Sequence, residues 1–116
     1  MGEFSRFIFE RRHFAPNENR VKPSAFVPWT DVEASVSDIR ELTEEQIWQL
    51  GDLTRANPPI ARGDFDEVVV KIAGLSLKED VPPVRHWQIL GWDPGSKDAQ
   101  KLTAQILAPL TTLEVR

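Results

Sequence analysis

The sequence predicts one α+β domain over residues 1–116, with a mostly antiparallel sheet of about five strands and two helices packed on one face. Three observations predict this class. Short aromatic and β-branched runs follow one another, with turn residues between them. Two segments carry helix-capping residues. Strands and helices do not alternate regularly, as they would in a parallel α/β fold.

The N-terminal third is expected to be strand and extended chain. Residues 4–9 (FSRFIF) predict a first strand, with even-numbered side chains on one face and odd-numbered side chains on the other. Because aromatic residues occur on both faces, both faces should be covered. Residues 21–29 contain two prolines and predict an edge strand or an extended segment. Residues 33–37 predict a short strand that pairs with it.

The first helix has the clearest start signal in the chain. Thr43 and Gln46 form a capping-box pattern, which predicts a helix from residue 44 to about residue 55. Its buried stripe is Ile47, Leu50 and Leu53. Trp48 stands beside this stripe and is expected in the core.

The second half is expected to hold three strands and a helix. Residues 65–75 contain the β-branched run 68–72 and predict a central strand. Residues 75–84 read as a loop, and residues 86–92 as the next strand. Ser96 caps a second helix that Pro109 ends, and residues 110–115 predict a final edge strand.

Charge and composition narrow the function classes. The net charge is -4, while residues 1–30 carry five basic and three acidic side chains, a local +2. The remaining chain therefore carries -6, which argues against broad nucleic-acid binding. There is no cysteine, so disulfides, thiolate catalysis and cysteine zinc sites are excluded. No stretch approaches the roughly 20 apolar residues of a membrane span, and a cytoplasmic location is expected.

Motifs with specific chemistry are missing. The sequence has no P-loop, no dinucleotide fingerprint, no nucleophile elbow, no zinc-protease motif and no EF-hand pattern. Neither a cofactor nor a metal ion is predicted, and no residue is assigned as catalytic. A non-enzymatic role is favoured, and an enzyme centred on His86 stays open as an alternative.

The candidate binding residues fall into three groups. Basic side chains interleaved with phenylalanines near the N-terminus suit phosphates and stacked bases, although a solvated basic face over a phenylalanine core is the favoured interpretation. Arg85 and His86 could hold an anion, or His86 could be half-buried and bonded to a backbone carbonyl. Two tryptophans are expected at the surface, where tryptophan often binds proteins. The candidates are Arg11, Arg12, His13, Arg20, Trp29, Arg85, His86 and Trp87.

Several pieces of the chain match a known pattern. They are Lys22-Pro23-x-Ala25-Phe26-x-Pro28, Ser35-Val36, Glu45-x-Ile47-Trp48-x-Leu50-Gly51 and Arg85-His86-x-x-Ile89-x-Gly91-Trp92. The chain thereby resembles a family of small uncharacterised bacterial proteins. It departs from that pattern at Trp87-Gln88 and near Asp38. The resemblance implies a bacterial origin and no particular activity.

Two functions follow as expectations. The first is a small bacterial interaction or accessory protein that binds another protein through a tryptophan-bearing surface, in the manner of an immunity protein, an antitoxin or a defence-complex subunit. The alternative is a nucleic-acid or nucleotide-binding protein that uses the basic N-terminal patch together with Arg85 and His86. The oligomeric state is left open.

Overall fold

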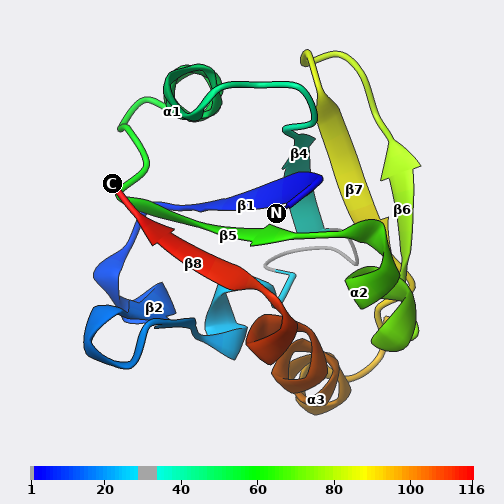
Figure 1. Ribbon diagram of the computed structural model, residues 1–116. Coiled ribbons are helices and arrows are strands. Elements are labelled where there is room, and N and C mark those ends of the chain that lie inside the picture. Colours follow the sequence, from blue (N-terminus) through cyan, green and yellow to red (C-terminus); the bar gives the residue numbers. More distant parts are fainter. Residues whose placement is uncertain (1, 29–33) are drawn as a thin grey trace.

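The computed structural model describes residues 2–28 and 34–116. Their largest element is a six-stranded antiparallel sheet with the strand order β6-β7-β4-β1-β5-β8 (Figure 1). Its strands are β1 (Phe4–Ile8), β4 (Ala34–Asp38), β5 (Ala61–Phe65), β6 (Ser76–Glu79), β7 (His86–Leu90) and β8 (Thr112–Val115). The short strands β2 (Phe14–Ala15) and β3 (Arg20–Val21) pair separately. The helices are α1 (Glu44–Asp52), α2 (Glu67–Ile72) and α3 (Lys97–Leu107). The α+β class and the antiparallel sheet are confirmed, with one more strand and one more helix than expected.

Strand β1 lies inside the sheet and is buried on both faces. Phe4 and Ile8 belong to the larger hydrophobic core, whereas Phe7 belongs to a smaller second core. Successive side chains of a strand point to opposite faces, so the two cores lie on opposite sides of β1. This confirms the two-faced first strand that residues 4–9 predict.

The helices divide between the two faces of the sheet (Figure 1). α2 and α3 bury Val70, Ala104 and Leu107 in the larger core. α1 buries Ile47 and Leu50 in the smaller core, on the other side. The structure thus differs from an arrangement with both capped helices on one face, because the phenylalanines of β1 require a cover on each side. Within the described ranges, no helix combines the length and apolar character needed to cross a bilayer.

Helix α1 begins as predicted and ends earlier. Thr43 Oγ1 accepts from the Gln46 amide at 3.2 Å, and Gln46 Oε1 accepts from the Thr43 amide at 2.9 Å. The helix ends at Asp52, so Leu53 lies beyond the buried stripe and is 78% exposed. Gly51 allows the close approach to β1, since a Cβ there would stand 2.7 Å from Phe7 Cε1. Trp48 packs beside this core but is only half-buried, which corrects the expectation of a core residue.

The predicted central strand at residues 65–75 is wrong. The β-branched run forms helix α2, and the strand beside β1 is β5, which comes just before it. The strand preference of β-branched residues depends on how they pack against their neighbours, and here Val70 is fully buried while Val68 and Ile72 are exposed. β5 was missed because its sequence, ARGDF, contains glycine and aspartate, which are depleted in strands, and no β-branched residue.

Two further segments differ from expectation. Residues 75–84, expected as a loop, include edge strand β6. Residues 21–29, expected as extended chain, hold the 3-10 turn η3 (Pro23–Ala25) instead, and β4 pairs with β1 and β7. The final edge strand is confirmed as β8.

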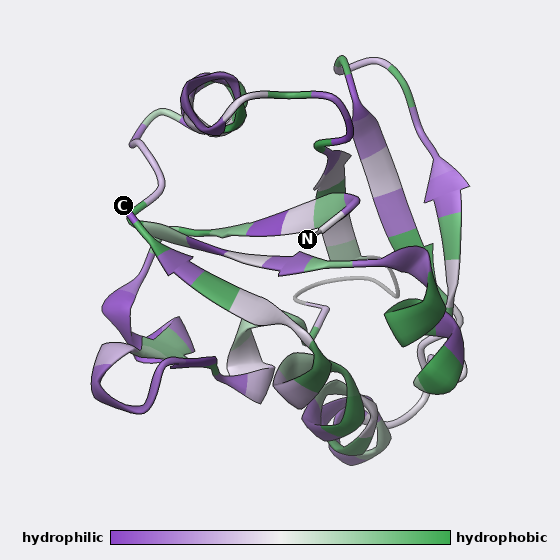
Figure 2. Ribbon diagram, viewed as in Figure 1, coloured by the Kyte–Doolittle hydropathy of each residue, from purple (hydrophilic) through white to green (hydrophobic). Residues whose placement is uncertain are grey.

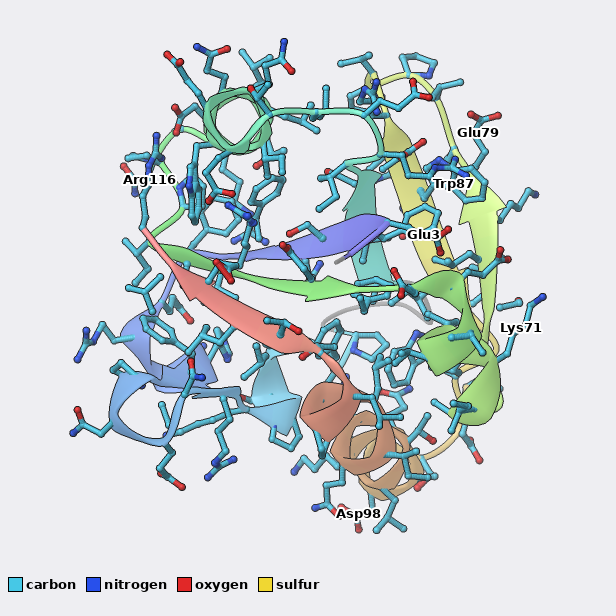
Figure 3. All side chains as sticks on the ribbon, in the orientation of Figure 1. Glu3, Lys71, Glu79, Trp87, Asp98 and Arg116 are labelled. Carbon is cyan, nitrogen blue, oxygen red and sulfur yellow. The ribbon has the colours of Figure 1, made fainter. Side chains whose placement is uncertain are left out.

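Trp87, which was expected at the surface, contacts the larger core, and so does Trp92. β7 ends at Leu90, and Gly91, with φ 103°, turns the chain. Strand alternation therefore does not extend to Trp92, which is buried with its Nε1 donating to Ile89 O at 3.0 Å. Trp87 is half-buried near the start of β1, where Glu3 also lies (Figure 3).

Arg62 of β5 fastens α1 to the sheet. Its side chain is 3% exposed, and its Nη1 and Nη2 donate to both carboxylate oxygens of Glu44 at 2.8 and 2.9 Å. Its Nε donates to Asp64 Oδ1 at 3.0 Å, and its guanidinium lies 4.6 Å from the Trp48 ring centre. Burial lowers the pKa of Arg62, but the hydrogen bonds and charges of the two carboxylates outweigh burial and raise it. At the other end of α1, Nη1 of Arg116, which Figure 3 labels, donates to Asp52 Oδ1 at 2.6 Å.

Replacing Arg62 should destabilise the fold strongly. Arg62→Met keeps an apolar stem but leaves Asp64, whose side chain is 11% exposed, without its partner. Removing one member of a buried ion pair costs about 3 kcal/mol or more. Chemical denaturation followed by circular dichroism measures this loss. The matched control is Arg20→Met, at an exposed pair with Glu18, where a change within about 0.5 kcal/mol is expected. Equal effects of the two substitutions would contradict the role of Arg62.

Candidate functional site

The sheet splits beside Arg6. β1 pairs with β5 along five residues, but with β4 only at Phe4 and Ser5. Beyond Ser5, the Arg6 side chain spans the opening, with Nε donating to Ala25 O at 2.8 Å and Nη1 donating to Ser35 O at 2.6 Å. Hydrogen bonds from a charged donor are among the stronger ones in proteins. Arg6 therefore links β1 to β4 and to the η3 turn.

A pocket of about 540 Å³ lies next to Arg6, between β1, η3, α3 and the segment that follows α1. We call it the basic pocket, because six of its lining side chains are basic and, among the described residues that line it, one is acidic, Glu10. The six are Arg6, Arg12, His13, Arg55, Lys97 and Lys101. Apolar side chains such as Phe9 and Val27 complete the walls. This size and mixture are typical of a site for a small molecule.

Three of these basic side chains have no carboxylate partner among the described residues. Arg12 is paired with Glu10 at 2.7 Å, and Lys97 Nζ donates to Pro28 O. Within the part of the chain that the structure describes, Arg6, Arg55 and Lys101 have no carboxylate partner. The Arg55 guanidinium instead lies 4.4 Å from the centre of the Phe9 ring. The described lining of the basic pocket therefore carries an excess of positive charge, in a chain whose net charge is -4.

Positive charges that lie close together in the basic pocket repel one another. Burial, with a contribution from the charge of Arg55, lowers the pKa of Arg6 to about 10, so Arg6 stays charged at neutral pH. Burial, with the charge of Arg12, also lowers the pKa of His13, which favours the neutral imidazole at neutral pH. A hydrogen bond from Arg12 lowers the pKa of Glu10 and keeps it ionised. A bound anion would relieve the repulsion between Arg6 and Arg55.

Of the four N-terminal basic candidates, the structure brings two to the basic pocket. Arg12 and His13 line it, and His13 Nδ1 lies 2.8 Å from Ser24 Oγ. Arg11 is exposed and stands 5.4 Å from the Phe14 ring centre, and Arg20 is exposed and paired with Glu18. Phe14 and Phe26, which alternate with these residues in the sequence, are core residues.

Arg85 and His86 do not meet the N-terminal cluster. Arg85 Nη1 donates to Asp38 O at 3.2 Å and to Arg40 O at 2.9 Å, which ties the start of β7 to the turn after β4. His86 is half-buried, with Nδ1 2.9 Å from Asp80 O, as the structural interpretation of this residue predicts.

The tryptophan candidates give little support to a binding surface. Trp87 packs edge-on against Phe4, with ring centres 5.2 Å apart. Trp29 lies outside the described residues.

Four basic residues of the pocket were missed in the sequence. Arg6 sits inside a predicted strand, Arg55 at a helix end, and Lys97 and Lys101 in a helix that looks ordinarily amphipathic. A usable signal did exist, since Lys97 and Lys101 are four residues apart and therefore share one helix face. No local pattern shows that β1 and α3, more than 85 residues apart, meet at one pocket.

Searches of family models, of curated proteins and of solved structures found no match. The bacterial family to which parts of the sequence point thus stays an expectation. Among the residues described, no three histidine, aspartate or glutamate side chains are grouped as metal ligands.

Proposed function

We propose that this chain is a small cytoplasmic, non-enzymatic binding protein that holds a phosphate-bearing small molecule in the basic pocket. The observation that carries the proposal is the convergence of Arg6, Arg55 and Lys101, three cations without a carboxylate partner among the described residues, at one concave site. They come from β1, from the segment that follows α1 and from α3.

The physical argument rests on the cost of placing like charges together. Arg6 is half-buried and its hydrogen bonds to described residues go to carbonyl oxygens, while Arg55 adds a second positive charge nearby. Charges that are partly removed from water interact more strongly than charges at an open surface. A multiply charged anion compensates several cations at once, and arginine is suited to bind a phosphate through two parallel hydrogen bonds.

The geometry favours a small ligand over a nucleic-acid duplex. Duplex binding needs phosphate contacts spread along a basic face, but here the cations surround one pocket. Arg20, outside it, is paired with an acid. The proposal thus keeps the nucleotide half of the alternative expected from the sequence, but assigns the phosphate to Arg6, Arg55 and Lys101 instead of Arg85 and His86.

Calorimetric titration with inorganic pyrophosphate tests the proposal. The protein should bind pyrophosphate, with an affinity that falls as salt is added. Arg55→Gln and Lys101→Gln should each weaken binding about tenfold, because a charged hydrogen bond is worth about 1.5 kcal/mol or more. The matched controls are Arg20→Gln and Lys78→Gln, which lie outside the pocket. No binding by the unaltered protein, or equal losses in the controls, would refute the proposal.

Binding to a partner protein, the first expectation from the sequence, is a second candidate. The described tryptophans do not favour it, since none forms an exposed patch. It is favoured by large apolar side chains that are exposed on α2 and α3. These two helices contact each other, and both carry apolar residues (Figure 2). They are Val68, Ile72, Leu102 and Ile106. Exposed apolar patches often mark protein contacts.

Substitutions on α2 and α3 distinguish binding of a partner protein from binding of a phosphate-bearing small molecule. If α2 and α3 contact a partner protein in the cell of origin, Ile72→Lys together with Leu102→Lys should abolish a complex isolated at natural expression. Pyrophosphate affinity should stay unchanged, because neither residue lines the basic pocket. A complex that survives both substitutions would rule out this surface.

A further inference from the structure

A second pocket, of about 230 Å³, adjoins the basic pocket. The two share Arg6, Phe7, Phe9 and Arg55 in their linings, so these four residues form the boundary between them. The second pocket lies on the face of the sheet that α1 covers, because its floor includes Ser37, which pairs with Ser5 beside Phe7. We call it the serine pocket.

The floor of the serine pocket is polar and uncharged, and its walls are apolar. Ser5 pairs with Ser37, and Ser37 pairs with His86, so their side chains form a row across β1, β4 and β7 on one face. Ser35 belongs to the next row. The walls are Leu50, Leu53, Pro83 and Val84. None of the described lining residues is acidic, and the cations are Arg6 and Arg55 at the boundary.

His86 gives this floor a hydrogen-bond acceptor. Its Nδ1 lies 2.9 Å from Asp80 O, which can only accept, so Nδ1 carries the hydrogen. In the neutral imidazole, Nε2 is then the acceptor, with Gln88 Nε2 3.5 Å away. Serine hydroxyls both donate and accept. The pocket therefore presents donors and acceptors at its floor and apolar groups at its sides.

We propose that the two pockets form one nucleotide-binding site, with phosphate groups in the basic pocket and the nucleoside in the serine pocket. This inference rests on the proposed function, and it adds the class of ligand. A nucleoside has a flat ring whose faces suit apolar walls and whose edges and sugar hydroxyls suit serine and imidazole groups. Arg6 and Arg55, which line both pockets, stand where the phosphate joins the nucleoside.

The test compares ligands that share the diphosphate group. Calorimetry is done with inorganic pyrophosphate and with the diphosphates of adenosine, guanosine, cytidine and uridine. At least one nucleoside diphosphate should bind about tenfold tighter than pyrophosphate, because the nucleoside adds contacts in the serine pocket. Ser35→Leu, which places an apolar group on the floor, should remove this tenfold advantage and leave pyrophosphate affinity within about twofold.

Two further variants keep the test decisive. Leu53→Trp narrows the serine pocket from an exposed wall residue, so it should remove the same advantage even if Ser35→Leu fails to fold. Ser76→Leu is the matched control, an exposed serine of β6 outside both pockets, and should change neither affinity. If pyrophosphate binds as tightly as every nucleoside diphosphate, the nucleotide inference is wrong and the phosphate site stands. If neither kind of ligand binds, the proposed function itself fails.

Discussion

The arrangement of this protein depends on one side chain that spans an opening in its own sheet. Arg6 belongs to β1, yet both hydrogen bonds of its guanidinium go to carbonyl oxygens of other segments, Ala25 and Ser35. A strand that pairs with β4 along only two residues would otherwise leave the two halves of the sheet weakly joined. The same charge faces two pockets and has no carboxylate partner among the described residues. The same guanidinium therefore joins parts of the fold and contributes charge to the proposed binding site.

The position of α1 completes the site. Arg62 holds the start of α1 through Glu44, and Gly51 allows its last turn to approach Phe7. The chain beyond α1 then carries Arg55 to the boundary between the pockets. The ion pair of the buried Arg62 with Glu44 thus affects the site indirectly, because it fixes the helix that precedes Arg55. From the other face of the sheet, α3 contributes Lys101.

The parts of the fold that sequence reasoning predicted are those specified by local chemistry. The alternation of residues 4–9 indicates a two-faced strand, and the capping residues Thr43 and Ser96 mark helix starts that the structure has. The failures occur where tertiary packing overrides local preference. The run at residues 68–72 has strand propensity but forms α2, and ARGDF has little strand character but forms β5. In β5, Arg62 and Asp64 neutralise each other, which makes a charged strand tolerable inside a sheet.

The site was harder to predict than the fold. Arg12 and His13 were candidates and do line the basic pocket, but both interact with an acidic side chain, Glu10. The cations that matter most to the proposal come from three separate elements, and nothing local to Arg6 or Lys101 marks them as neighbours. Arg85 and His86 drew attention because they are adjacent in sequence. The structure assigns them to a turn and a strand end, with His86 on the floor of the serine pocket.

The central claim is that anions bind between Arg6 and Arg55, and the most direct measurement is a nuclear magnetic resonance titration of the arginine Nε–H signals with pyrophosphate. The account predicts that the Nε–H signals of Arg6 and Arg55 move together and saturate, while those of Arg20 and Arg40, which are paired with Glu18 and Asp38, stay in place. Signals of Arg20 and Arg40 that move as far as those of Arg6 and Arg55 would instead show diffuse attraction to surface charge. That result, or no movement at Arg6, would contradict the account.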